Sequence, residues 1–70
     1  MSLAMKIKDT NQVKQMISFE GESMRKFAKR IDIDPGMLSA YMNNKKFPSP
    51  PTAKKIADGL GVEIKDIFLV

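Results

Sequence analysis

The sequence predicts a compact all-α domain of five short helices, and three observations lead to that prediction. Residues that cap helix starts recur along the chain, and glycine or asparagine follows several apolar stretches. Apolar residues recur at spacings of three and four, whereas the two-residue alternation of a half-buried strand is scarce. Seventy residues allow one small domain and leave little room for a large enclosed cleft. We therefore expect a single domain over residues 5–70.

The first two helices are marked by their ends. Asp9 is expected to cap the first helix, over about 10–20, and Gly21 supplies the left-handed residue that stops it. Ser23 is a good N-cap for a second, shorter helix over about 24–31. Apolar residues in both segments fall on one helical face, which is typical of packing against a core.

The third helix has the clearest start, because Asp34 is an N-cap acid and Pro35 suits the first helical position. It is expected over about 35–43. The Asn43-Asn44 pair ends it, since asparagine tolerates a left-handed turn better than other residues with a Cβ atom. A tight turn therefore separates the second and third helices.

The rest of the chain predicts a basic loop and two more helices. The loop is Lys45-Lys46-Phe47-Pro48, with Phe47 as its expected apolar anchor. Ser49 is expected to cap a fourth helix that runs to about residue 59 and is stopped by Gly61 shortly after. A short fifth helix is expected over 62–68, and residues 6–8 are compatible with an extended segment.

The composition argues against an enzyme and against a metal site. Cysteine and histidine are both absent, which removes disulfides, thiolate ligands, the commonest general base and the commonest metal ligand. We therefore expect no catalytic residues, no metal and no cofactor. The longest apolar run, 67–70, is far shorter than the ~20 residues that span a bilayer. No signal peptide is recognisable, so a cytoplasmic protein without a membrane partner is expected, and residues 1–4 read as an expression remnant ahead of Met5.

The positive charge is concentrated in one third of the chain. The formal net charge is +4, from 12 basic and 8 acidic residues, and residues 24–46 carry all of this excess. The charged residues of that segment are Arg25, Lys26, Lys29, Arg30, Lys45 and Lys46 against Asp32 and Asp34. A focused positive patch is typical of proteins that bind a polyanion, although a solvated helix face has the same composition.

The second and third helices, over about 23–43, form a candidate helix-turn-helix, in which the second helix of the pair enters the major groove of DNA. At this point the sequence resembles the phage-repressor and Cro-like (XRE) helix-turn-helix family over about residues 10–68. The ordered segments that carry the resemblance are Gly21–Ser23, Phe27–Ile31, Ile33–Ser39, Asn43–Ser49 and Ile56–Val62. The resemblance implies a compact five-helix, lambda-repressor-like DNA-binding domain.

The chain departs from the family pattern at two positions. Members often pair an arginine late in the first helix with a glutamate at the end of the third, and Ile17 and Met42 stand there. Losing one partner of a buried ion pair costs about 3–5 kcal/mol, whereas replacing both with apolar side chains can be neutral. We therefore predict that Ile17 and Met42 touch.

A second departure concerns the side chains that read bases. The base-reading candidates are Pro35, Gly36, Ser39, Ala40 and Asn43. Proline, glycine and alanine have no side-chain donor, so specificity would come from the few polar residues, from DNA shape or from thymine methyl groups. The phosphate-binding candidates are Ser23, Met24, Arg25, Asn44, Lys45, Lys46 and Thr52. Free amides at a helix start commonly bind phosphate, and Pro50 and Pro51 remove two of them from the fourth helix, which leaves Thr52, Lys45 and Lys46 for that role.

These observations favour sequence-dependent binding of double-stranded DNA by a small transcription regulator of the repressor type. The alternative is a protein-interaction module on the same fold with weak or lost DNA reading. A homodimer is expected on DNA, because one short helix reads only a few base pairs. Its candidate interface is the apolar run Ile67, Phe68, Leu69 and Val70; in the competing interpretation Ile67 and Phe68 complete the core.

Overall fold

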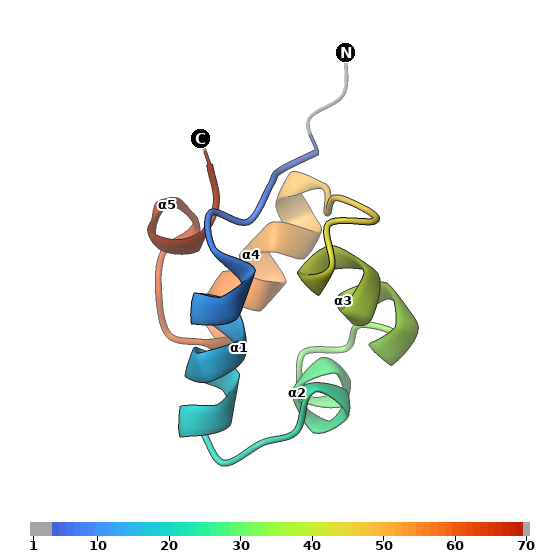
Figure 1. The fold of residues 1–70 in the computed structure, drawn as a ribbon, viewed down its shortest axis with the longest axis vertical. Coiled ribbons are helices and arrows are strands. Elements are labelled where there is room, and N and C mark those ends of the chain that lie inside the picture. Colours follow the sequence, from blue (N-terminus) through green and yellow to red (C-terminus); the bar gives the residue numbers. More distant parts are fainter. Residues whose placement is uncertain (1–3, 70) are drawn as a thin grey trace.

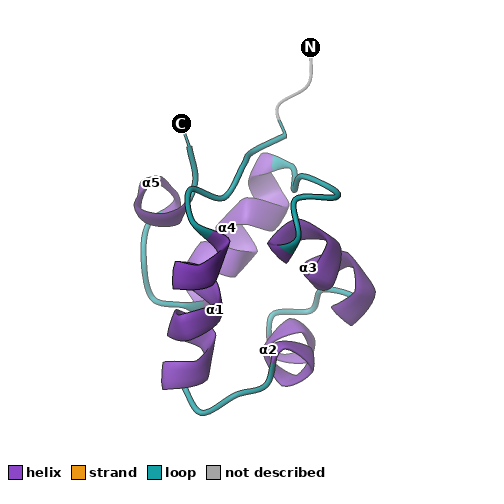
Figure 2. Cartoon of the chain, in the orientation of Figure 1, coloured by secondary structure: helices purple, strands orange, loops and turns teal. Residues whose placement is uncertain are grey.

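The computed structural model describes residues 4–69, which form five helices (Figures 1 and 2). The helices are α1 Thr10–Phe19, α2 Met24–Arg30, α3 Pro35–Met42, α4 Pro50–Gly59 and α5 Ile64–Ile67. Within the described residues the only β-type pairing is an isolated bridge between Ile7 and Phe68. The predicted all-α fold and the order of its helices are confirmed.

The first three helices begin where their capping residues predict. The side chains of Asp9, Ser23 and Asp34 accept hydrogen bonds from backbone amides in the first turns of α1, α2 and α3. Each bond satisfies a donor that has no partner inside its helix, which stabilises such a start by about 1 kcal/mol. These boundaries follow from interactions within four residues of the chain.

The ends of three helices use left-handed residues, as predicted. Gly21, Asn44 and Gly61 have φ angles of +78°, +57° and +70° after α1, α3 and α4. The sequence did not predict a fourth left-handed residue, Asp32 at +61°, in the turn between α2 and α3. Aspartate tolerates this region because its short polar side chain can bond locally.

Ser49 occupies the N-cap position of α4 without making the predicted capping hydrogen bond. Pro50 and Pro51 fill the first two helical positions, and neither has an amide hydrogen to donate. Ser49 Oγ lies instead 3.3 Å from Thr52 Oγ1. The prolines therefore set the start of α4 through their fixed φ angle.

The fifth helix is shorter than the predicted 62–68. It begins after Glu63, whose backbone amide donates to Asp66 Oδ2 at 2.9 Å. Phe68 already has an extended conformation (φ −115°, ψ 151°) and pairs with Ile7 at the other end of the chain. A contact between the two termini thus ends this helix, which no local pattern could reveal.

The N-terminal and C-terminal segments lie side by side (Figure 1). Lys8 N donates to Ile67 O at 2.9 Å, and Leu69 N donates to Lys6 O at 2.8 Å. This antiparallel pairing joins the N-terminal segment to the residues that follow α5. The extended conformation expected for residues 6–8 is therefore found around Ile7, through a partner far away in sequence.

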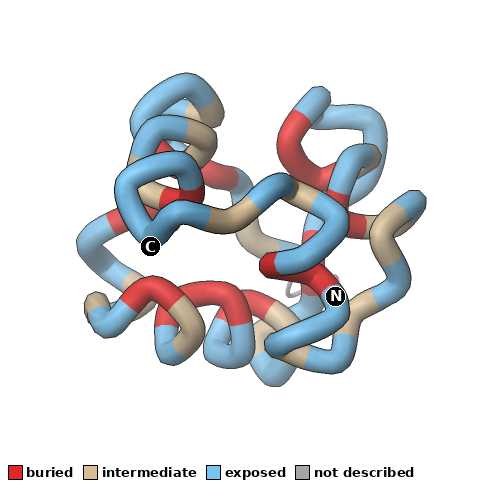
Figure 3. The backbone as a smooth tube through the Cα atoms, turned by 90° about the horizontal axis from the view of Figure 1, so that it is seen from below, coloured by how far each residue is buried: buried red, intermediate tan, exposed pale blue. Residues whose placement is uncertain are grey.

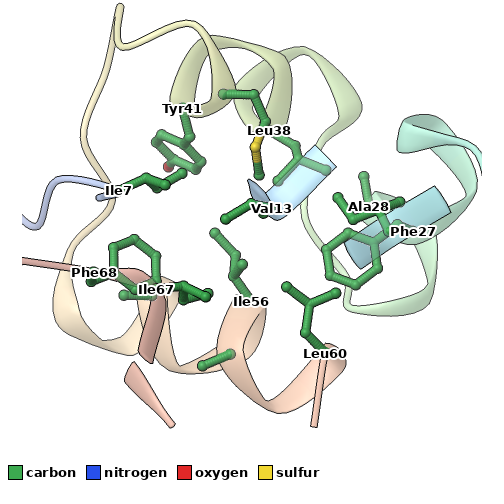
Figure 4. Close-up of a cluster of buried hydrophobic side chains, with 14 residues drawn as sticks. Ile7, Val13, Phe27, Ala28, Leu38, Tyr41, Ile56, Leu60, Ile67 and Phe68 are labelled. Carbon is green, nitrogen blue, oxygen red and sulfur yellow. The ribbon is translucent and has the colours of Figure 1, made fainter. Parts of the chain in front are cut away.

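Every helix and the N-terminal segment contribute to one hydrophobic core. Its buried members are Ile7, Val13, Ile17, Phe27, Ala28, Leu38, Tyr41, Met42, Ala53, Ile56, Ala57, Leu60, Ile67 and Phe68. Figure 4 shows Phe27 beside Leu60 at one end of this cluster, Ile67 and Phe68 at the other, and Val13 between them. Buried and exposed stretches alternate along the helices, as amphipathic segments require (Figure 3).

The core includes two residues of the predicted dimer interface. Ile67 and Phe68 are 1% and 0% exposed, so they are not available to a partner and that assignment is wrong for them. The competing interpretation, in which they complete the core, is confirmed. Leu69 is 54% exposed, and Val70 lies outside the described residues, as do residues 1–3 of the expected remnant.

Ile17 and Met42 are both buried, at 2% and 1% exposure. They belong to α1 and α3, which pack against each other. Among the described residues no charged or polar residue is buried, so the core carries no unpaired charge. The paired apolar exchange is compatible with this packing, and the direct contact of the two side chains stays a prediction.

Replacing Gly59 by alanine is expected to destabilise the domain, although alanine usually favours a helix by about 1 kcal/mol. A Cβ atom at Gly59 would lie 2.5 Å from Ile31 Cγ2 and 3.1 Å from Phe27 Cε1. Such overpacking costs roughly 1–3 kcal/mol. Urea unfolding should therefore show a lower midpoint for Gly59→Ala than for the wild type.

The double variant Gly59→Ala/Ile31→Ala is the control. It removes the methyl group that the new Cβ atom meets, so the two changes should cost less together than the sum of the single changes. A Gly59→Ala protein as stable as the wild type would mean that α2 and α4 move apart without loss.

Candidate nucleic-acid interface

The helices α2 and α3 and the turn between them form a helix-turn-helix unit. The two helices pack against each other. Ile33 N donates to Ala28 O at 2.8 Å, and Asp32 N donates to Lys29 O at 3.2 Å, so the turn is closed by backbone hydrogen bonds. Ile31 and Ile33 are half-buried against the core. The orientation of α3 is therefore set by both bonding and packing.

One side of α3 faces the core and the other faces outward. Leu38, Tyr41 and Met42 are buried. Of the base-reading candidates within the helix, Gly36 and Ser39 are exposed, and Pro35 and Ala40 are half-buried. The outer side of the helix is thus narrow and carries few polar groups.

The two polar candidates on this side, Ser39 and Asn43, contact each other. Asn43 Nδ2 donates to Ser39 O at 2.9 Å and lies 3.4 Å from Ser39 Oγ. Residues spaced by four are neighbours on a helix surface, so the two side chains form one polar spot. Such a spot offers a hydroxyl group and an amide group to a groove.

The loop after α3 folds back along that helix. Lys45 N and Lys46 N both donate to Ala40 O, at 2.9 and 3.3 Å. Lys46 Nζ lies 3.9 Å from Met37 Sδ, near the start of α3. These contacts hold the backbone of the loop against α3 and place the Lys46 ammonium group beside that helix.

The residue that holds this loop is Pro48 rather than Phe47. Pro48 is fully buried, and its carbonyl accepts a hydrogen bond from Met5 N at 2.8 Å. Phe47, the expected apolar anchor, is instead 45% exposed. The N-terminal segment lies against Pro48 through this hydrogen bond, and the adjacent ring of Phe47 stays on the outside.

A family model described as a helix-turn-helix domain, of the XRE and Cro-like type, matches residues 10–70. The chain belongs to this helix-turn-helix family. No curated protein and no solved structure matches it. Family membership implies DNA binding and a role in transcription regulation, in agreement with the exposed α3 and its cationic loop.

The helix-turn-helix domain uses several of its candidate phosphate-binding groups for local structure. The hydroxyl of Ser23 caps α2, and that of Thr52 lies against Ser49. Met24, the first residue of α2, is half-buried against the core. Arg25 and Asn44 are exposed. The sequence found these positions but could not show which side chains were already engaged.

Arg30 is basic but serves the structure of the helix-turn-helix domain. Its guanidinium makes an ion pair with Glu22, with Nη2 2.8 Å from Oε1, and donates to Gly59 O at 2.9 Å. It also lies over the Phe27 ring, 5.2 Å from the centroid. The hydrogen bond between the two side chains lowers the pKa of Glu22 and raises the pKa of Arg30. This side chain therefore ties α2 to the end of α4.

Five other cations of the 24–46 segment remain accessible to a ligand: Arg25, Lys26, Lys29, Lys45 and Lys46 are exposed. Within the described part of the chain, the ion pairs involve Arg30, Lys54 and Lys65, and none of those five. The basic side chains of this segment are therefore all exposed, and Arg30 differs from the other five by its ion pair with Glu22.

Among residues 4–69, no group of three acidic side chains is placed to hold a metal ion. No helix over the same residues is long and apolar enough to cross a membrane.

Proposed function

We propose that this helix-turn-helix domain recognises double-stranded DNA in a sequence-dependent way and acts as a small repressor-type regulator in the cytoplasm. The observation that carries the proposal is the position of the exposed Lys45-Lys46 loop beside α3. An α-helix with its side chains is about 10–12 Å across, which fits the ~12 Å width of the major groove. The helix enters the groove, and the lysines bind the phosphates beside it.

Base recognition depends on a small set of groups. Ser39 and Asn43 supply hydrogen-bonding groups, and Ala40 supplies an apolar contact suited to a thymine methyl group. Asn43 would exchange its bond with Ser39 O for bonds to a base edge. Because these contacts are few, we propose that two copies bind adjacent half-sites as a homodimer. The buried Ile67 and Phe68 take no part in its interface.

Selection of bound sites from random duplex DNA tests this function directly. A recurring motif with two half-sites about one helical turn apart is the expected result. Repression follows if a bound site excludes other proteins from the same DNA, and a reporter carrying the selected site measures it. Recovery of no motif at low salt would favour the protein-interaction alternative.

Ser39→Ala and Asn43→Ala are expected to change the preference among sequences more than the overall affinity. Each substitution removes hydrogen-bonding capacity from the polar spot, and one such bond corresponds to roughly a three- to tenfold difference between sites. Competition between the best site and its single-base variants measures this ratio. Ser18→Ala, at an exposed serine on α1, is the matched control and should leave the ratio unchanged. If Ser39→Ala and Asn43→Ala keep the wild-type ratio, as Ser18→Ala should, α3 does not read bases through these side chains.

A further inference from the structure

Phe47 is an exposed aromatic side chain in a loop whose backbone is closely held. The backbone turns at Asn44 with a φ of +57° and bonds to Ala40 O through two successive amides. Pro48 is buried and bonded to Met5 N, and a residue that precedes proline is restricted to extended conformations. The 45% exposure of Phe47 is therefore a feature of an ordered loop.

The two residues before Phe47 in the loop are cationic. Lys45 and Lys46 precede it directly, both are exposed, and neither forms an ion pair within the described residues. If Phe47 docked on an apolar protein surface, both ammonium groups would approach that surface and lose hydration. DNA avoids this cost, because a phosphate group lies on each side of every sugar. Charge complementarity thus favours DNA as the occupant.

The path of the chain places the loop at the edge of the groove. The recognition helix of a helix-turn-helix protein lies in the major groove, which the two sugar-phosphate strands border. The segment that follows the C-terminal end of α3 therefore leaves the groove over a sugar-phosphate strand. The two backbone hydrogen bonds to Ala40 O hold the loop against α3, and Lys46 Nζ lies 3.9 Å from Met37 Sδ on the same helix.

We propose that Phe47 packs against deoxyribose rings of the strand that borders the major groove, between phosphates bound by Lys45 and Lys46. This inference rests on the proposed function and adds an apolar contact to it. The contact does not release counterions, so it contributes equally at all salt concentrations. In RNA the 2′-hydroxyl group makes the corresponding sugar surface polar, so the same contact favours DNA.

The test is the affinity of Phe47→Ala for the best selected duplex, measured across a series of salt concentrations. Loss of a buried aromatic contact should weaken binding roughly tenfold. The slope of log K against log salt should stay that of the wild type, because no phosphate contact is removed. Phe47→Leu, which keeps an apolar side chain, should retain most of the affinity.

Phe19→Ala is the matched control. Phe19 is also an exposed phenylalanine, at 86%, and lies at the end of α1, at the opposite end of the molecule from the loop (Figure 1). Its replacement should change neither the affinity nor the slope. Circular dichroism confirms that each variant remains folded before binding is measured.

The possible failures are distinguishable. If the wild type binds DNA and Phe47→Ala binds equally well, the Phe47 contact is wrong and the proposed function stands. If Phe47→Ala changes the sedimentation of the free protein, the ring belongs to a contact between copies of the chain, which also overturns the proposal. If the wild type binds no duplex even at low salt, the proposed function itself fails.

Discussion

Replacing Phe68 by alanine is expected to unfold most of the domain. The side chain is fully buried beside Ile67, and its backbone pairs with Ile7. Truncating a buried phenylalanine costs about 3–5 kcal/mol. The core of a domain below ~70–80 residues rarely supplies more than about 3–5 kcal/mol of net stability, so little would remain. Circular dichroism and urea titration measure the loss.

Leu69→Ala is the control for this prediction. Leu69 is the next residue and is 54% exposed, so its truncation should change the stability by about 0.5 kcal/mol or less. The pair also distinguishes core from interface. If Phe68 belonged to a dimer surface, Phe68→Ala would stay folded and would instead change the sedimentation coefficient.

Replacing both Lys45 and Lys46 by alanine is expected to weaken binding to all DNA sequences alike. Each phosphate contact contributes a slope of about −0.9 to log K against log salt, so the slope should become shallower by about 1.8. If the variant and the wild type bind equally at 1 M salt, this slope corresponds at 0.1 M salt to roughly an eightfold loss of affinity per contact and about sixtyfold for both. Fluorescence anisotropy on a selected site and on an unrelated duplex, over a salt series, measures both quantities.

Lys54→Ala/Lys65→Ala is the control, because it removes the same charge from a different surface. These lysines lie on α4 and α5 and are paired with Asp58 and Glu63, at 3.0 and 3.5 Å. If the two double variants have the same salt slope, net charge alone accounts for the effect. An unchanged slope in Lys45→Ala/Lys46→Ala would show that the loop lysines do not bind phosphate.

Local interactions explain why the sequence predicts most of the fold. The starts of α1, α2 and α3 depend on Asp9, Ser23 and Asp34, each bonded to an amide two or three residues ahead. The ends at Gly21 and Asn44 depend on the conformational freedom of single residues. The family match over residues 10–70 agrees with the resemblance found in the same ordered segments.

The sequence predicted which residues lie in the candidate site, but not which of their side chains are free to bind DNA. The basic segment 24–46 and the exposed Ser39 were both found in the sequence. That Arg30 is engaged with Glu22 and Gly59 could not be found there, because the carbonyl of Gly59 reaches it only after α4 packs against α2. Composition counts a charge in the same way whether or not it is already paired.

The sequence by itself determined the helices, the turns between them and the basic middle of the chain, since each depends on residues within a few positions of one another. Only the tertiary structure decided that Phe68 leaves α5 to pair with Ile7, and that Pro48 rather than Phe47 is covered. Both results depend on where the N-terminal segment lies. Its position is set by burial and backbone pairing between the two ends of the chain, which neither end specifies alone.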